Sequence, residues 1–248
     1  MTRKDKHGLW ILSFVAAFFL GMLVWLYCLK VSADNIDPET LCRVGKQDPV
    51  VKLLIDKTDP WDEHTRQRLV AAILRIKSGL AVHERLSIFV LDETGTYSPS
   101  PLFDMCNPGR GDQANDLYQN PRRMQMKFNE QFAGPLDALM ETLQRPGVAS
   151  SSPIIEALHG LRSDNSQERL IIVSDMMQNS SNLSFYGRKQ DMHYTRENDI
   201  CRLETPYTSI HVYFVNRRNI SVSQKQQVRI FWDQCLDRAA WATRWDVL

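Results

Sequence analysis

The chain has 248 residues, 43% of them hydrophobic and 24% charged, and its 30 Lys and Arg residues nearly balance its 29 Asp and Glu residues. This length suits one domain of ordinary size with an appendage and excludes two large domains. The formal net charge of +1 offers no basic face to a phosphate backbone, so we expect no nucleic-acid partner.

Residues 9–29 read LWILSFVAAFFLGMLVWLYCL, an uncharged stretch long enough to cross the hydrocarbon as a helix. Positive charges crowd the flank at residues 1–8 and are sparse on the trailing side. The positive-inside rule therefore predicts a transmembrane helix with a cytoplasmic N-terminus and a main domain on the periplasmic or extracellular side. A cleaved signal peptide is the alternative, because residues 31–33 resemble a cleavage site, but the apolar stretch is long for one.

Four cysteines lie beyond the apolar stretch: Cys42, Cys106, Cys201 and Cys235. An even number in an exported domain is compatible with two disulfides, in three connectivities among which the sequence does not choose. Four buried thiols are the alternative. The spacing matches no zinc pattern.

Residues 30–48 are polar and predict a tether, which leaves residues 49–248 as the exported domain. Short apolar runs predict strands at 50–55, 86–91, 169–173 and 209–215 and an edge strand at 243–248. Helical spacing of apolar residues predicts helices at 66–77, 128–143, 153–161 and 222–241, and residues 94–123 predict a long irregular loop. This alternation predicts an α/β fold with a doubly wound, mostly parallel sheet.

Ligands of such sheets bind at the carboxyl ends of the strands. Asp56 and Asp175 each follow a predicted strand, Thr58 comes two residues after the first acid, and Ser152 is the expected cap of the helix at 153–161. Two carboxylates with hydroxyls and water form an all-oxygen set suited to Mg²⁺. We expect a metal with open positions for a partner's carboxylate. The alternative is that these acids cap helices or bind loop N–H groups.

These residues resemble the metal-ion-dependent adhesion site of von Willebrand factor A-like domains. That site uses Asp-x-Ser-x-Ser after the first strand, Thr-x4-Ala-Leu at a helix start, and an Asp after the fourth strand. Here DKTDP stands at residues 56–60, SPIIEAL at 152–158 and SD at 174–175. Two departures, Pro60 in place of a hydroxyl and Met176 where Asp-Gly is usual, leave open whether the implied metal site works, with water or Asp59 as compensation, or is vestigial.

The resemblance implies a membrane-anchored protein-binding module, a subunit of a membrane or envelope complex, with the polar stretches 94–127 and 178–208 shaping its binding face. One alternative is a phosphotransfer enzyme with Asp56 as nucleophile, because IDKT at residues 55–58 resembles the aspartyl-phosphate motif of haloacid dehalogenase-like proteins; the Gly-Thr that should follow is absent. A purely structural membrane subunit is another. The Arg-Gly-Asp tripeptide at 110–112 is expected to be a polar turn.

Overall fold

A computed structural model describes residues 10, 13–25, 35–91, 100–115, 117, 119–145, 147, 149–161, 167–186, 207–217 and 220–248. The chain forms two compact units, Met1–Ile36 and Asp37–Leu248. In the first unit, residues 13–25 are helical and exposed, and the rest of the predicted span 9–29, apart from residue 10, lies outside the described residues. Among the helices that are described, none has the length and apolarity needed to cross a membrane.

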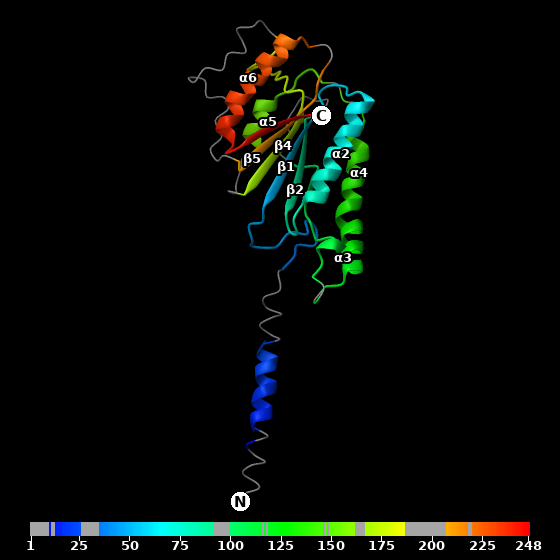
Figure 1. Ribbon diagram of the computed structural model, residues 1–248, viewed down its shortest axis with the longest axis vertical. Helices are drawn as coiled ribbons and strands as arrows, with labels where there is room; N and C mark the ends of the chain where they lie inside the picture. Colours follow the sequence, from blue (N-terminus) through cyan, green and yellow to red (C-terminus); the bar gives the residue numbers. More distant parts are fainter. Residues whose placement is uncertain are drawn as a thin grey trace, which may run out of the picture. The chain divides into compact units, whose positions relative to one another are not determined.

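The second unit alternates strands and helices (Figure 1). Its strands are β1 (Val50–Asp56), β2 (Arg85–Leu91), β3 (Phe103–Cys106), β4 (Glu168–Ser174), β5 (Ser209–Phe214) and β6 (Thr243–Val247). Its α-helices are α2 (Glu63–Gly79), α3 (Pro121–Phe128), α4 (Gly134–Leu143), α5 (Ile154–Gly160) and α6 (Val222–Ala239). A 3-10 turn, η1 (Gly111–Gln113), precedes α3, and a π-helical turn, η2 (Asn129–Ala133), joins α3 to α4.

The six strands form one mixed sheet in the order β3-β2-β1-β4-β5-β6. β3 is antiparallel to β2, and every other neighbouring pair is parallel. β1 is central, with Ile55 opposite Val90 of β2 and Val173 of β4. The α/β class and the mostly parallel sheet predicted from the sequence are therefore confirmed.

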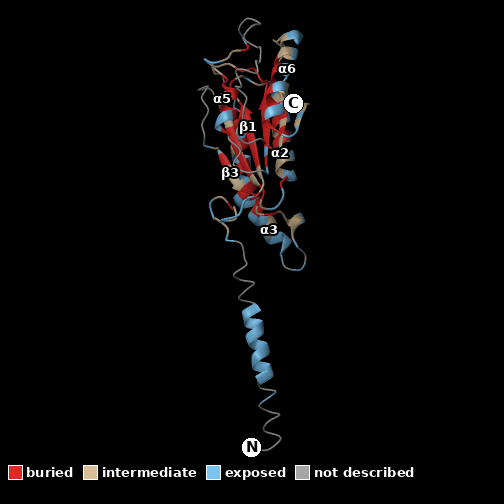
Figure 2. Ribbon diagram, turned by 90° about the vertical axis from the view of Figure 1, so that its left-hand side faces the viewer, coloured by how far each residue is buried: buried red, intermediate tan, exposed pale blue. Residues whose placement is uncertain are grey.

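Side chains that alternate along the strands build a core on each face of the sheet. In β1, Leu53 packs in the core beneath α2, α3 and α4, whereas Leu54 packs in the core beneath α5 and α6. Figure 2 shows the sheet as a band of buried residues whose covering helices have exposed outer faces. This three-layer arrangement buries both faces of the sheet, which explains why its strands read as nearly continuous apolar runs.

Several predicted elements differ from the structure. Strand β3 lies inside the predicted loop 94–123, where neighbouring prolines hide a short edge strand. The predicted helix 128–143 begins earlier, at Pro121, and contains the η2 turn. Pro135 explains that turn, because a proline has no N–H for the helical ladder and its ring clashes with the preceding turn.

Residues predicted as tether contribute to the second unit, which starts at Asp37. Leu41 is buried in the core, Thr40 O accepts a hydrogen bond of 2.8 Å from Cys106 N, and Cys42 forms a disulfide with Cys106. Cys235 is also disulfide-bonded. The disulfide prediction is thus confirmed for Cys42 and Cys106, whereas Cys201 lies outside the described residues.

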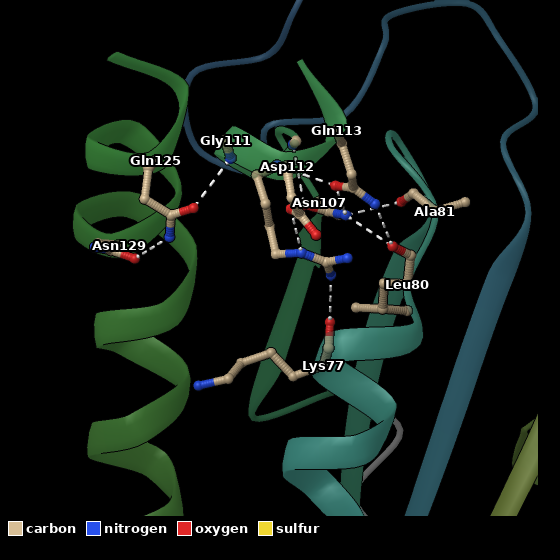
Figure 3. Close-up of polar contacts among 11 residues, drawn as sticks. Lys77, Leu80, Ala81, Asn107, Gly111, Asp112, Gln113, Gln125 and Asn129 are labelled. Atoms are coloured by element: carbon tan, nitrogen blue, oxygen red, sulfur yellow. Dashed lines mark hydrogen bonds and ion pairs between the residues drawn. The ribbon is translucent and has the colours of Figure 1, made fainter. Parts of the chain in front are cut away.

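The segment after β3 closes the C-terminal end of α2 (Figure 3). The fully buried Asn107 donates from Nδ2 to Leu80 O and Ala81 O, both at 3.0 Å, and its Oδ1 accepts from Gly109 N at 3.0 Å. Arg110 donates to Lys77 O at 3.3 Å. These bonds satisfy carbonyl groups that a helix end leaves without intrahelical partners.

The Arg-Gly-Asp tripeptide is part of this closure. Arg110 pairs with Asp112 at 3.1 Å, and only 18% of the Arg110 side chain is exposed. Gly111 N donates to the side chain of Gln125 at 3.0 Å. A side chain at Gly111 would meet Pro121 O at 2.8 Å, so only glycine fits there. The tripeptide is a polar turn between β3 and α3, as the sequence predicted, and it contacts both α2 and α3.

We predict that Asn107→Ala lowers the free energy of unfolding by roughly 2 kcal/mol, because it leaves the buried Gly109 N without its partner and removes one of two donors each from Leu80 O and Ala81 O. Urea unfolding followed by circular dichroism measures this loss. Asn115→Ala is the control: Asn115 is exposed and its side chain accepts only a surface bond from Leu117 N, so the expected loss is below about 1 kcal/mol. Equal losses would contradict the structural role of Asn107.

Candidate functional site

Asp56, the last residue of β1, is the centre of a buried polar cluster at the carboxyl edge of the sheet. Its Oδ1 atom accepts from Thr58 Oγ1 at 2.6 Å and from Thr58 N at 3.1 Å. Its Oδ2 atom accepts from Ser174 Oγ at 2.7 Å and from Ser152 Oγ at 3.1 Å. Only 4% of Asp56 is exposed. The carboxylate is therefore held by hydroxyl and amide donors from three segments.

Backbone pairing brings Ser152 to this cluster. Ser152 N donates to Asn179 O at 2.7 Å and Asn179 N donates to Ser152 O at 2.9 Å, which ties the start of α5 to the loop after β4. Ala149 N donates to Thr58 O at 2.7 Å. At Gly147 a Cβ atom would lie 2.2 Å from Lys57 O, so this close approach requires glycine.

Ser152 does not cap α5, contrary to the sequence prediction. The cap position falls on Pro153 and has no side-chain hydrogen bond. Instead, Gln178 Oε1 accepts from Ile155 N at 2.9 Å, which satisfies a donor in the first turn. The hydroxyl of Ser152 is thereby available to Asp56.

Asp175 follows β4 and is 5% exposed. Its Oδ1 atom accepts from Met177 N at 2.9 Å. The next residue, Met176, has φ +59°, a left-handed conformation that favours glycine. This is the position where the von Willebrand factor A-like pattern has Gly, and here a fully buried methionine adopts the left-handed conformation.

Arg217, three residues after β5, supplies the positive charge of the site. Its Nε atom forms an ion pair with Asp175 Oδ2, and its Nη2 atom forms an ion pair with Asp59. Nη1 donates to the hydroxyl of Tyr186 at 3.1 Å. Asp175 Oδ2 and Arg217 Nη2 are both shielded from solvent, so these atoms depend on their ionic partners. The sequence analysis missed Arg217 and Tyr186.

Electrostatics follow from burial and from the two neighbouring acids. Burial raises the pKa of Asp175 to about 7, and the negative charge of Asp56 adds to the rise. The guanidinium of Arg217 acts in the opposite direction, because an adjacent cation favours the ionised carboxylate. Burial, together with Asp175 and Asp56, also raises the pKa of Tyr186 to about 12. Its phenol therefore stays neutral and accepts a hydrogen bond from Arg217.

The structure brings together all four residues that the sequence proposed as metal ligands, Asp56, Thr58, Ser152 and Asp175. Their oxygens are of the chemical type that Mg²⁺ prefers. The negative charge of Asp175, however, is already paired with a cation, because its Oδ2 atom contacts the guanidinium of Arg217. Asp59 also pairs with Arg217. Within the described ranges, no group of three or more His, Cys, Asp or Glu side chains is placed to hold a metal ion.

A cavity of about 400 Å³ lies next to the cluster, between the loops that follow β1 and β5. The lining residues are Asp59, Pro60, Trp61, Asp62, Thr65, Val215, Asn216 and Arg217. Pro60, which offers no side-chain donor to the site, is exposed at this cavity. Arg217 thus has one side toward the buried acids and lines an open hollow where a ligand group can enter.

Comparisons with known proteins do not place the chain in a family. No protein-family model and no curated protein matches the chain. Among solved structures, the crystal structure of the human COPII-coat protein Sec24c is similar at 10% sequence identity and a TM-score of 0.36. The match covers 83% of this chain and 30% of the Sec24c chain. A likeness this weak carries no argument about function.

We predict that Arg217→Gln destabilises the chain more at high pH than at low pH. The variant removes the cation beside buried Asp175, so the pKa of Asp175, which burial already raises to about 7 with Arg217 in place, rises further. A raised carboxyl pKa favours folding at low pH, and this contribution is lost as pH rises through that pKa. We expect a loss of roughly 2–4 kcal/mol at about pH 8 and a smaller loss at about pH 5.5, measured by urea unfolding.

Arg229→Gln on α6 is the matched control, because Arg229 pairs with Asp233 at 2.9 Å on an exposed helix face and lies 3.9 Å from the centre of the Trp245 ring. An exposed ion pair and an exposed cation–π contact contribute at most about 1 kcal/mol each, and we expect their loss to be the same at both pH values. A loss for Arg217→Gln that does not change with pH, or that is no larger than this control, would contradict the assigned role.

Proposed function

We propose that this chain is a protein-binding module with a von Willebrand factor A-like fold. The observation that carries the proposal is the convergence of the three motif segments, 56–58, 152–158 and 174–175, at one edge of the sheet beside an open cavity. In α/β sheets this edge is where ligands bind. The partner would dock over Arg217, Trp61 and Asn216, and the loop after β4 would border the contact.

We further propose that residues 9–29 anchor the module in a membrane, with the N-terminus in the cytoplasm and the binding unit in the periplasm or outside the cell. The uncharged stretch and its positive leading flank support this topology. The Cys42–Cys106 disulfide supports an oxidising compartment. As a subunit of a membrane or envelope complex, the protein would meet its partner on that side.

Magnesium remains a prediction. Asp56, Thr58, Ser152 and Asp175 would hold it only if it displaced the guanidinium that pairs with Asp175, and it would then supply a positive charge for a partner's carboxylate. In the structure this charge comes from Arg217, so the proposed recognition does not depend on a metal.

The geometry favours binding over phosphotransfer by Asp56. Both oxygens of this carboxylate accept hydrogen bonds from hydroxyl groups, which lowers its reactivity as a nucleophile. Trapping with aluminium or beryllium fluoride tests the enzymatic alternative, because stable capture that requires Asp56 would overturn the binding proposal. A purely structural subunit would need none of these contacts.

Site-specific photo-cross-linking in native membranes tests the proposed surface. A photoreactive residue is placed at Asn216 or at Pro60, both of which are exposed at the cavity. Leu117 is the control position: it is 82% exposed and follows β3, whose end pairs with the start of β2, so it lies at the opposite edge of the sheet. We expect the same cross-linked protein from both cavity positions and none of it from Leu117.

Loss of this product on substitution of Trp61 by Ala would strengthen the assignment, because Trp61 lines the cavity. Cross-linking from Leu117 alone, or from no cavity position, would contradict the proposal and favour the purely structural alternative.

A further inference from the structure

Arg217 lies where a cation is needed, and three segments of the chain bring it there. β5 is parallel to β4, so the residues after both strands meet at the same sheet edge. The guanidinium contacts Asp175 after β4 and Asp59 after β1. Only 23% of its side chain is exposed. Arg110 is equally shielded, at 18% exposed, but among the described residues it pairs with Asp112 alone, whereas Arg217 pairs with two acids that follow different strands.

The buried acids require a positive charge that the other contacts do not supply. Asp56 and Asp175 are 4% and 5% exposed, and Asp56 acts on the pKa of Asp175 as a like charge. The bonds to Asp56 come from hydroxyls and one amide, which are neutral donors. Removing two neighbouring carboxylates from water is costly unless a cation compensates, and Arg217 is the cation that contacts Asp175.

We propose that Arg217 is the resident cation of this site and takes the place of a divalent metal, so that the protein binds its partner without metal and admits one only when the guanidinium is removed. The part of this inference that concerns partner binding rests on the proposed function. The part that concerns metal binding does not. The planar guanidinium suits the role because its separate N–H groups reach two carboxylates at once. Its Nη1 atom also donates a hydrogen bond to the Tyr186 hydroxyl, which helps to hold it in place.

The remaining donor capacity of Arg217 defines the partner's chemistry. A guanidinium has five N–H donors, and the contacts with Asp175, Asp59 and Tyr186 use one each at Nε, Nη2 and Nη1. Because Nη2 is shielded from solvent, the second N–H of Nη1 is the donor left for a ligand. Arg217 also lines the cavity. We infer that a carboxylate of the partner is bound there by the guanidinium.

Binding of Mn²⁺ to the purified full chain tests the proposal. Titrations followed by electron paramagnetic resonance of free Mn²⁺ and by thermal melting compare the wild type with Arg217→Gln. We expect the variant to bind Mn²⁺ at least about tenfold more tightly than the wild type, with a corresponding rise of its melting temperature. Arg217→Lys keeps a positive charge and should gain little; Arg217→Gln with Asp175→Asn removes a ligand and should lose the gain.

Arg229→Gln serves as the control for removing a positive charge elsewhere and should leave Mn²⁺ binding unchanged. A wild type that by itself binds Mn²⁺ in a saturable way, with a rise in its melting temperature, would overturn the proposal, and this measurement needs no folded Arg217→Gln variant. A folded Arg217→Gln variant without added affinity would overturn it as well.

The two proposals fail separately. Metal binding gained by Arg217→Gln while cavity cross-linking is absent would refute the proposed partner surface and leave the resident cation intact. Cavity cross-linking that persists while the variant gains no metal affinity would refute only the resident cation.

Discussion

The neutralisation of Asp56 and Asp175 is the constraint on which the site depends. Two carboxyl groups that are almost fully buried at one sheet edge repel each other, and removing either from water is costly unless a cation or a proton compensates. Hydroxyl donors hold Asp56, whereas Asp175 relies on Arg217. How these negative charges are balanced decides what this edge of the sheet can bind. If Arg217 already neutralises the acids, the site does not require a metal ion.

The parallel sheet makes this arrangement possible. β1, β4 and β5 are neighbours and run in the same direction, so the residues that follow them lie side by side although they are far apart in the chain. The backbone pairing of Ser152 with Asn179 adds a fourth segment. Packing on both faces fixes the strand register, and the register in turn fixes which side chains converge at the edge.

Sequence patterns predicted the buried parallel strands well, because their apolar runs leave few alternatives. The same rule for strand ends placed Asp56 and Asp175 together. Arg217 follows β5 at the same edge, but the sequence does not distinguish it from an arginine whose side chain simply extends into solvent. Only the three-dimensional structure shows that it pairs with the acids. β3 was missed because a short edge strand beside prolines has no strong period, and the Ser152 cap was wrong because Asp56, distant in sequence, competes for its hydroxyl.

A double-mutant cycle between Arg217 and Asp175 tests the central claim most directly. The free energies of unfolding of Arg217→Gln, Asp175→Asn and the double variant are compared with the wild type at about pH 8. The two residues, if they neutralise each other in a buried site, should show a favourable coupling of about 2 kcal/mol or more. Additive losses, with a coupling below about 0.5 kcal/mol, would show that Arg217 is not the counter-charge of the buried acids.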